Sequence, residues 1–181
     1  MADNDTLTFL LGRIATGDKK AMKAVYTQLG PDLHRFICTR MRDPQEAADV
    51  LQETMLEVWR RAGTFEGRSA ARTWIFGIAR NKAADRARRA VHTGAEPDED
   101  IPDDAPTPEA ALAALQEGSA LRACLEKLSP PQRAVIHLAF FQDVSYRAIA
   151  EIEDCALNTV KTRIFHAKKL LMHCLSKADG R

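Results

Sequence analysis

The chain has 181 residues, of which 45% are hydrophobic and 28% are charged, with a formal net charge of +1. This length suffices for one domain or two small ones, and no apolar run is long enough to span a membrane. The N-terminus lacks the basic start and apolar stretch of a secretion signal, so we expect no export. The cysteines, Cys38, Cys124, Cys155 and Cys174, include no CxxC pair, and we expect reduced thiols in a cytoplasmic protein.

The small net charge hides a segregation of charge along the chain. Residues 1–92 contain 16 Lys and Arg against 11 Asp and Glu, residues 93–120 contain none against 8, and residues 121–181 contain 10 against 6. The acidic stretch also holds four prolines within residues 94–108, which predicts a flexible, extended tether. Such a tether is either a solubilising spacer or a segment that lies along a basic groove as a nucleic-acid backbone does.

Helical periodicity runs through residues 1–92, and we find no strand pattern there. A first helix is predicted to begin at Gly17-Asp18 and to carry Val25 and Leu29 inward. Gly30-Pro31 is predicted to interrupt it, because proline removes a backbone donor from a helix interior. A second helical piece is then expected to reach Met41.

The next helix opens with a capping box, Asp43-Pro44-Gln45-Glu46, and is predicted to run to about Ala62. Its buried stripe is expected to consist of Val50, Leu51, Met55, Val58 and Trp59. Its other face aligns Asp49, Gln52, Glu53, Leu56 and Arg60. On the pattern alone, this polar face fits plain exposure to solvent as well as it fits a binding surface.

A loop over residues 63–69 places Phe65 between glycines, and a strongly basic helix is predicted from about Ala71 to Arg89. The apolar stripe of that helix is Trp74, Ile75, Ile78 and Ala79. Its cations are Arg72, Arg80, Lys82, Arg86, Arg88 and Arg89. Cations beside a loop aromatic favour single-stranded nucleic acid, because they bind phosphates while the ring stacks on a base. The alternative is that Phe65 packs into the core.

Residues 129–171 have the pattern of a helix-turn-helix. Ser129-Pro130-Pro131-Gln132 provides a capping box and prolines in the first turn of its first helix. We expect that helix to turn three apolar side chains inward: Val135, Leu138 and Phe141. A short second helix is predicted from Tyr146 to Ile152, capped by Ser145.

The last helix carries the most informative pattern in the chain. It follows a turn over residues 153–156, is predicted to be capped by Asn158, and has an apolar stripe of Val160, Ile164, Ala167, Leu171 and Cys174. The opposite arc presents Asn158, Lys161, Thr162, Phe165, His166 and Lys169. A solvated face seldom presents an aromatic among lysines and a threonine, whereas a helix in the DNA major groove uses such a set. The alternative is an ordinary amphipathic helix in a bundle.

Together these motifs resemble the extracytoplasmic-function sigma factors, the smallest class of the bacterial sigma-70 family. The N-terminal part of the resemblance consists of residues 49–54 (DVLQET), Phe65 and residues 71–81 (ARTWIFGIARN). The C-terminal part consists of residues 128–133 (LSPPQR), 145–152 (SYRAIAEI) and 158–163 (NTVKTR). The resemblance covers nearly the whole chain apart from the tether and the termini.

The resemblance implies an all-α protein with no active site and no cofactor. It implies a sigma-2-like helical domain over residues 1–92, a flexible acidic, proline-containing linker over 93–112, and a sigma-4-like helix-turn-helix domain over 113–181. The implied partners are core RNA polymerase, promoter DNA and a cognate anti-sigma factor, without insertion into a membrane.

Roles for individual residues also follow from the resemblance. The largest subunit of core polymerase would be met by Asp49, Gln52 and Glu53. The −10 element, with a base flipped out of the duplex, would be held by Phe65, Arg72, Arg80 and Asn81. The −35 bases would be read in the major groove by Lys161, Thr162, Phe165 and His166. The −35 phosphates would be held by Arg133, Thr159, Arg163 and Lys168.

The turn of the helix-turn-helix departs from the family pattern, in which glycine is usual near Asp154, Ala156 and Asn158. Aspartate and asparagine tolerate the left-handed backbone better than other residues, so we expect the turn to form.

Two other functions are weighed against the sigma factor. A self-sufficient DNA-binding regulator needs a dimerisation or sensory domain, which residues 1–92 would have to provide. A nucleic-acid enzyme lacks any catalytic constellation in this sequence. His34 and Cys38, four residues apart, would be half a metal site, but no second pair accompanies them and we expect no metal.

Overall fold

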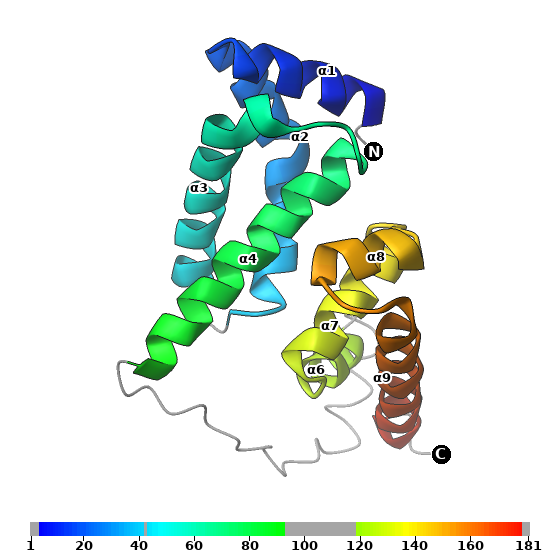
Figure 1. Ribbon diagram of the computed structural model, residues 1–181. Helices are drawn as coiled ribbons and strands as arrows, with labels where there is room; N and C mark the ends of the chain where they lie inside the picture. Colours follow the sequence, from blue (N-terminus) through cyan, green and yellow to red (C-terminus); the bar gives the residue numbers. More distant parts are fainter. Residues whose placement is uncertain (1–3, 42, 93–118, 179–181) are drawn as a thin grey trace.

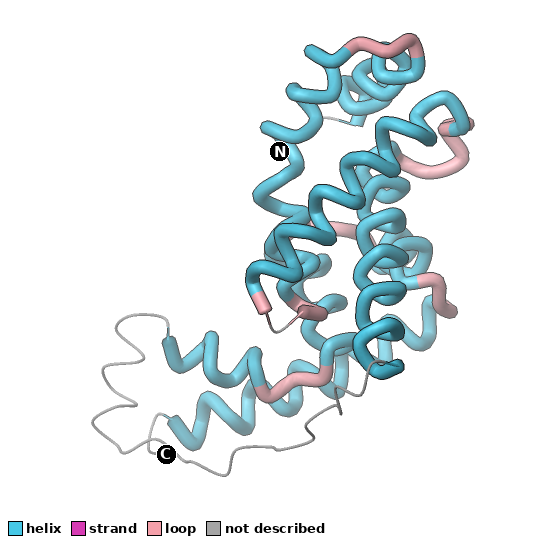
Figure 2. Tube along the Cα trace, turned by 90° about the vertical axis from the view of Figure 1, so that its left-hand side faces the viewer, coloured by secondary structure: helices cyan, strands magenta, loops and turns pink. Residues whose placement is uncertain are grey.

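The computed structural model describes residues 4–41, 43–92 and 119–178, and within these ranges every regular element is helical (Figure 1). Figure 2, turned by 90°, shows the same helices joined by short loops. The all-α prediction is therefore confirmed. The predicted linker over residues 93–112 lies outside the described residues.

The N-terminal domain contains α1 (Asn4–Ala15), α2 (Lys19–Cys38), α3 (Pro44–Arg61), a 3-10 turn (Ala62–Thr64) and α4 (Ala71–His92). The predicted caps are present: the Asp18 carboxylate accepts the Lys20 N–H at 2.7 Å, and the Asp43 carboxylate accepts the Gln45 N–H at 2.9 Å. The sequence analysis missed α1, although four of its apolar residues are buried in the shared core: Leu7, Leu10, Leu11 and Ile14.

The predicted interruption at Gly30-Pro31 is wrong, since α2 continues through Pro31. A proline inside a helix costs about 3 kcal/mol, whereas burying a large apolar side chain contributes about 1.5–3 kcal/mol. Leu29, Leu33 and Phe36 are fully buried on either side of the proline. Their packing outweighs the missing backbone hydrogen bond and keeps the helix whole.

The C-terminal domain contains α6 (Ser119–Glu126), α7 (Pro130–Ile136), α8 (Tyr146–Glu153) and α9 (Leu157–Ala178). The Ser129 N–H donates to the Gln132 side chain at 3.1 Å, and the Ser145 hydroxyl accepts the Ala148 N–H at 3.3 Å, as the capping motifs predict. Asp154 adopts the left-handed backbone at φ 49°, so the turn forms without glycine.

Two details of this domain differ from the prediction. A π-helix (His137–Phe141) extends α7 and shifts the helical register, so that Leu138 is buried while Phe141 is 55% exposed. Asn158 does not cap α9, because the helix already begins at Leu157 and the Ala156 carbonyl accepts the Thr159 N–H at 2.9 Å. The predicted stripe of α9 is buried at Val160, Ile164 and Ala167.

The two domains pack directly against each other. In Figure 1, α8 lies beside α4, and the two helices are in contact. A single apolar core runs through both domains and includes Phe36 and Phe76 from one and Ile149 and Ile152 from the other. A smaller cluster around Leu128, Ile136 and Ala167 belongs to the C-terminal domain alone.

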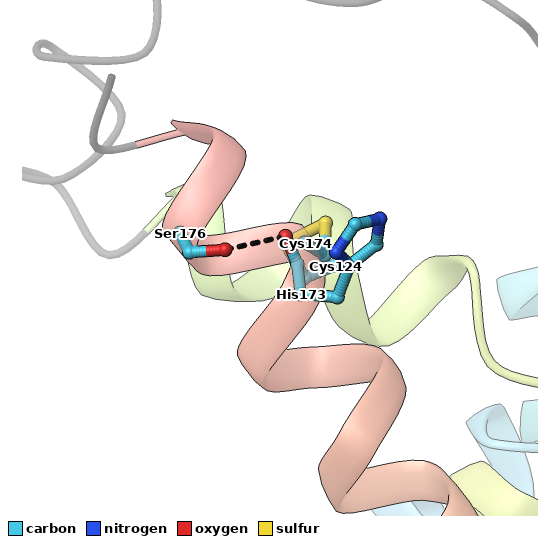
Figure 3. Close-up of a disulfide and its surroundings, with 4 residues drawn as sticks. All are labelled: Cys124, His173, Cys174 and Ser176. Atoms are coloured by element: carbon cyan, nitrogen blue, oxygen red, sulfur yellow. Dashed lines mark hydrogen bonds between the residues drawn. A yellow bond between two sulfur atoms is a disulfide. The ribbon is translucent and has the colours of Figure 1, made fainter. Parts of the chain in front are cut away.

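A disulfide joins Cys124 of α6 to Cys174 of α9, with the two Cα atoms 5.8 Å apart (Figure 3). The expectation of four reduced thiols is therefore wrong for this pair, while Cys38 and Cys155 are free. The two cysteines are separated by 50 positions, and only the packing of α6 along α9 brings them together. Sequence spacing carries no signal for such a pair.

Candidate nucleic-acid interface

The outward face of α9 presents most of the residues predicted to read bases. Lys161, Thr162, Phe165 and His166 are all exposed, and the Phe165 side chain is 66% exposed. The Phe165 and His166 rings meet edge to face, with their centroids 5.5 Å apart. The stripe on the other side of the helix is buried, so this face is free to enter a groove of suitable width.

The four residues predicted to hold phosphates next to this face differ in their exposure and in the groups that they contact. Lys168 is exposed, with its ammonium 4.8 Å from the centre of the exposed Phe140 ring. Thr159 is half-buried. Arg133 donates to the Leu128 carbonyl at 3.3 Å, and Arg163 lies 3.8 Å from the buried Glu153 carboxylate. In this conformation the two arginines contact groups of the protein itself.

A small cavity lies at the loop before α4. It measures about 210 Å³ and is lined by Thr64, Phe65, Glu66, Arg68, Ser69 and Trp74. Phe65 is half-buried, and its ring is tilted against that of Trp74 with the centroids 5.4 Å apart. The ring packs against the apolar core and also forms one wall of an open cavity, and its stacking on a base stays a prediction.

The sequence analysis missed Trp74 and Arg68 as wall residues of this cavity. The sequence analysis assigned Trp74 only to the core stripe of its helix, because the contact between Phe65 and Trp74 depends on how the loop over residues 63–69 folds back. Asn81, predicted to act together with Phe65, does not line the cavity. It lies two turns beyond Trp74, about 10 Å along α4, where its side chain is exposed and accepts a hydrogen bond from Arg80 at 2.9 Å.

Arg72 and Arg80, the arginines predicted to contact DNA on α4, bind the C-terminal domain in this structure. Arg72 is 15% exposed, lies 2.9 Å from the Asp32 carboxylate and donates to the side chain of Gln142. Arg80 donates to the main-chain carbonyl of Glu153 at 3.1 Å. These contacts occupy part of the hydrogen-bonding capacity of both guanidiniums.

The charges around Arg72 also set the titration of two neighbours. Burial raises the pKa of the Asp32 carboxyl, but the hydrogen bond and positive charge of Arg72, together with a hydrogen bond from Gln142 and the charge of Arg35, more than reverse this, and the pKa lies below its ordinary value. Burial, followed by the charge of Arg35, lowers the pKa of His137 to about 4. His137 is therefore neutral at pH 7, with its ring 6.5 Å from that of Phe36 in the other domain.

The polar face of α3 gathers the residues predicted to meet the polymerase. Asp49, Gln52 and Glu53 share this face, and both carboxylates lie near the Arg86 guanidinium of α4, at 3.4 and 3.7 Å. Leu56 lies on the same face and is 49% exposed, although the sequence analysis gave it no role. A single exposed leucine is ordinary on a protein surface, so the role of this face in binding the polymerase stays a prediction.

Among the described residues, no group of three His, Cys, Asp or Glu side chains is placed to hold a metal ion. The His34 Nδ1 atom and the Cys38 sulfur are 3.8 Å apart, without a further ligand beside them. Burial raises the pKa of the Cys38 thiol. None of the helices in the described ranges has the length and apolar character needed to cross a membrane.

The sequence matches two family models, Sigma-70 region 2 over residues 25–93 and Sigma-70 region 4 over residues 119–171. It is 32% identical to the ECF RNA polymerase sigma factor RpoE of Cereibacter sphaeroides over 151 residues, which cover 81% of this chain and 82% of the relative. It is 29% identical to the RNA polymerase sigma-H factor of Pseudomonas aeruginosa over 179 residues, covering 90% of each chain.

Two solved structures share the fold. The sigma factor RpoE in complex with the anti-sigma factor NepR from Bartonella quintana superposes with a TM-score of 0.68 at 28% identity, covering 87% of this chain and 98% of that one. CnrH in complex with the cytosolic domain of CnrY also gives a TM-score of 0.68, at 22% identity, covering 95% of this chain and 98% of that one.

Proposed function

This chain belongs to the extracytoplasmic-function sigma factors of the sigma-70 family, and from that premise we propose which of its surfaces direct RNA polymerase to a promoter. A sigma factor binds core RNA polymerase, recognises −35 and −10 promoter elements and promotes melting of the duplex at the start of transcription. It is a transcription regulator, and we assign this chain no catalytic activity of its own. We place it in the bacterial cytoplasm, where its polymerase works.

The exposed face of α9 is the observation that carries the proposal. Lys161, Thr162, Phe165 and His166 project from a helix whose opposite side is buried, and the turn at Asp154 fixes how that helix leaves α8. In the major groove these side chains meet base edges of the −35 element. The phosphates on either side are held by Arg133, Thr159, Arg163 and Lys168.

The −10 element is assigned to the N-terminal domain. A base unstacked from the duplex enters the cavity between Phe65 and Trp74, where stacking on an aromatic ring is worth about 1–3 kcal/mol. This offsets the few kcal/mol that extruding a base costs. Arg72, Arg80 and Asn81 follow along α4 and hold the strand that leads to the cavity.

Core polymerase is assigned to the polar face of α3, through Asp49, Gln52 and Glu53 with Leu56 in their midst. A patch of carboxylates around an exposed leucine fits a basic partner surface that has an apolar centre. The remaining partner is a cognate anti-sigma factor, since a solved relative at 28% identity is bound to one.

Reconstituted transcription tests the proposal. A promoter is first identified by mapping transcript starts after overexpression, and the purified chain is then added to core polymerase on that template. We expect start-specific RNA and tight duplex binding only with core present. Equal binding of the duplex without core would instead support the self-sufficient regulator.

The matched variants Lys161→Ala and Arg163→Ala test the assignment of α9. Loss of a base contact changes affinity by about 1–3 kcal/mol at particular positions, whereas loss of a phosphate contact weakens all sequences alike. A selection on randomised −35 elements therefore distinguishes the two variants. An unchanged preference profile for Lys161→Ala would contradict direct readout by this face.

A further inference from the structure

A buried ion pair joins the two domains. Glu153 ends α8 and is 3% exposed, and its carboxylate accepts hydrogen bonds on both oxygens from Arg40, which follows α2 in the other domain. Arg163 lies 3.8 Å from the same carboxylate, and Arg80 donates to the Glu153 carbonyl at 3.1 Å. A carboxylate removed from water requires such partners, because an unpaired buried charge is strongly unfavourable. The burial of Glu153 therefore depends on the N-terminal domain.

A second polar contact crosses the same boundary. Gln142 is 6% exposed, and its side-chain oxygen accepts a hydrogen bond from Arg72, which Asp32 holds at 2.9 Å. Next to it, the neutral ring of His137 packs beside Phe36. Polar groups from both domains thus satisfy each other inside an interface that is apolar elsewhere, which makes this contact specific.

Three of the arginines at these contacts are ones assigned to DNA. Arg72 and Arg80 belong to the proposed −10 surface, and Arg163 belongs to the proposed −35 surface. In the closed molecule they approach the oxygen atoms of Gln142 and Glu153. An arginine binds phosphate through the same donors, so these oxygens occupy the place that phosphate oxygens would take.

We propose that Arg40, Arg72 and Arg80 with Gln142 and Glu153 form an intramolecular latch that closes the free protein and masks its own promoter-binding arginines. The masking of DNA-binding arginines rests on the proposed function, whereas the closure of the two domains rests on the interface alone. Opening the latch frees the two DNA-assigned arginines of the N-terminal domain, Arg72 and Arg80, at once. If about a tenth of the free molecules are open, complete opening raises the apparent affinity for DNA about tenfold.

Charge reversal across the pair tests the latch. Arg40→Glu and Glu153→Arg each place like charges together, whereas the double variant restores an opposite pair with its direction reversed. Neither residue belongs to the assigned DNA or polymerase surfaces. Glu151→Arg is the matched control, because Glu151 is exposed on the same helix, and Glu153→Gln removes the charge with little change of shape.

Two measurements are made on the full chain. Small-angle scattering gives the radius of gyration, and fluorescence anisotropy gives affinity for a labelled single-stranded oligonucleotide carrying the non-template −10 sequence of the mapped promoter. We expect both single variants and Glu153→Gln to expand and to bind this strand about tenfold more tightly. We expect Glu151→Arg to stay compact and to bind like the wild type. We expect the double variant to be more compact than Glu153→Arg, although its new arginine lies beside Arg163.

Single variants that remain as compact as the wild type would overturn the latch, as would a double variant that is no more compact than Glu153→Arg. Variants that expand without any gain in affinity would overturn the masking. Circular dichroism identifies a variant that fails to fold, and the isosteric Glu153→Gln then decides the result. Start-specific transcription by the wild type with core polymerase tests the proposed function separately, so its failure is distinguishable from failure of the latch.

Discussion

Breaking the Cys124–Cys174 disulfide should destabilise the C-terminal domain far more than the rest of the protein. The bond closes a loop of 50 residues, and for that length the chain-entropy model gives about 4 kcal/mol of stabilisation at 25 °C. The domain has only a small cluster of its own, around Leu128, Ile136 and Ala167. A loss of this size is a large share of the roughly 5–15 kcal/mol that stabilises a typical domain.

Urea unfolding of the full chain with and without a reducing agent measures this effect. The double variant Cys38→Ser/Cys155→Ser removes the free thiols, so any response to the reductant then comes from the disulfide. We expect the reduced protein and a Cys174→Ser variant to unfold at the same lower urea concentration. Coincident curves for the oxidised and reduced protein would refute the reasoning, because they would mean that packing alone holds α6 against α9.

Reduction of the Cys124–Cys174 disulfide should change the sequence preference for the −35 element little. Cys174 lies eight residues beyond His166, about 12 Å along α9, and on the buried rather than the outward side of the helix. The order of preference among −35 sequences is therefore expected to be the same in both redox states. A changed preference at equal domain stability would show that the bond alters the geometry of the reading face.

Three further predictions concern the remaining surfaces. Burial, followed by the charge of Arg35, lowers the pKa of His137 to about 4, whereas its value in the unfolded chain is near 6.5. Between these two pH values the unfolded chain binds more protons than the folded one. The free energy of unfolding should therefore fall as the pH drops from about 6.5 to 4, by up to about 1.4 kcal/mol per pH unit. Urea titrations across this range should show the slope, and the slope should be smaller in His137→Gln, where groups such as Asp32 contribute only near pH 4. Reversing charge at both Asp49 and Glu53 should weaken co-purification with core polymerase while changing stability by less than about half a kcal/mol, and undiminished co-purification would mean that this face is only solvated. Phe65→Ala should reduce permanganate reactivity of the −10 region on duplex but much less on a pre-melted bubble; equal defects on both templates, with a clear drop in melting temperature, would mean that the ring acts only in packing.

The elements that could be predicted from the sequence are those set by local chemistry. Asp43 and Ser145 cap helices where the motifs place them, because a cap depends on residues two or three positions away. The left-handed backbone at Asp154 follows in the same way from the side chain at that position. The exposed face of α9 follows from the buried stripe opposite to it, since both obey one helical period.

The features that could not be predicted depend on residues far apart in the chain. Arg40 and Glu153 are 113 positions apart, and Arg72 and Gln142 are 70 positions apart. The sequence analysis assigned Glu153 to an ordinary turn, because nothing in its neighbourhood along the chain indicates that the other domain will bury it. The π-helix that exposes Phe141 has the same character, since the register of a helix end is decided by what it packs against.

The energetics of the Arg40–Glu153 pair suit a contact that must open. A buried pair gains attraction in the closed state but loses hydration of both charges, and on opening both groups return to water. The net contribution of the pair to closure is therefore small compared with its gross interaction, and the apolar core that the two domains share supplies the rest of the preference for closure. Removal of one partner, in contrast, leaves the other charge buried and unpaired in the closed state. This costs about 3–5 kcal/mol, and the protein opens. The ion pair thus makes closure of the latch sensitive to substitution of either charge, whereas the apolar part of the same interface would respond little to charge.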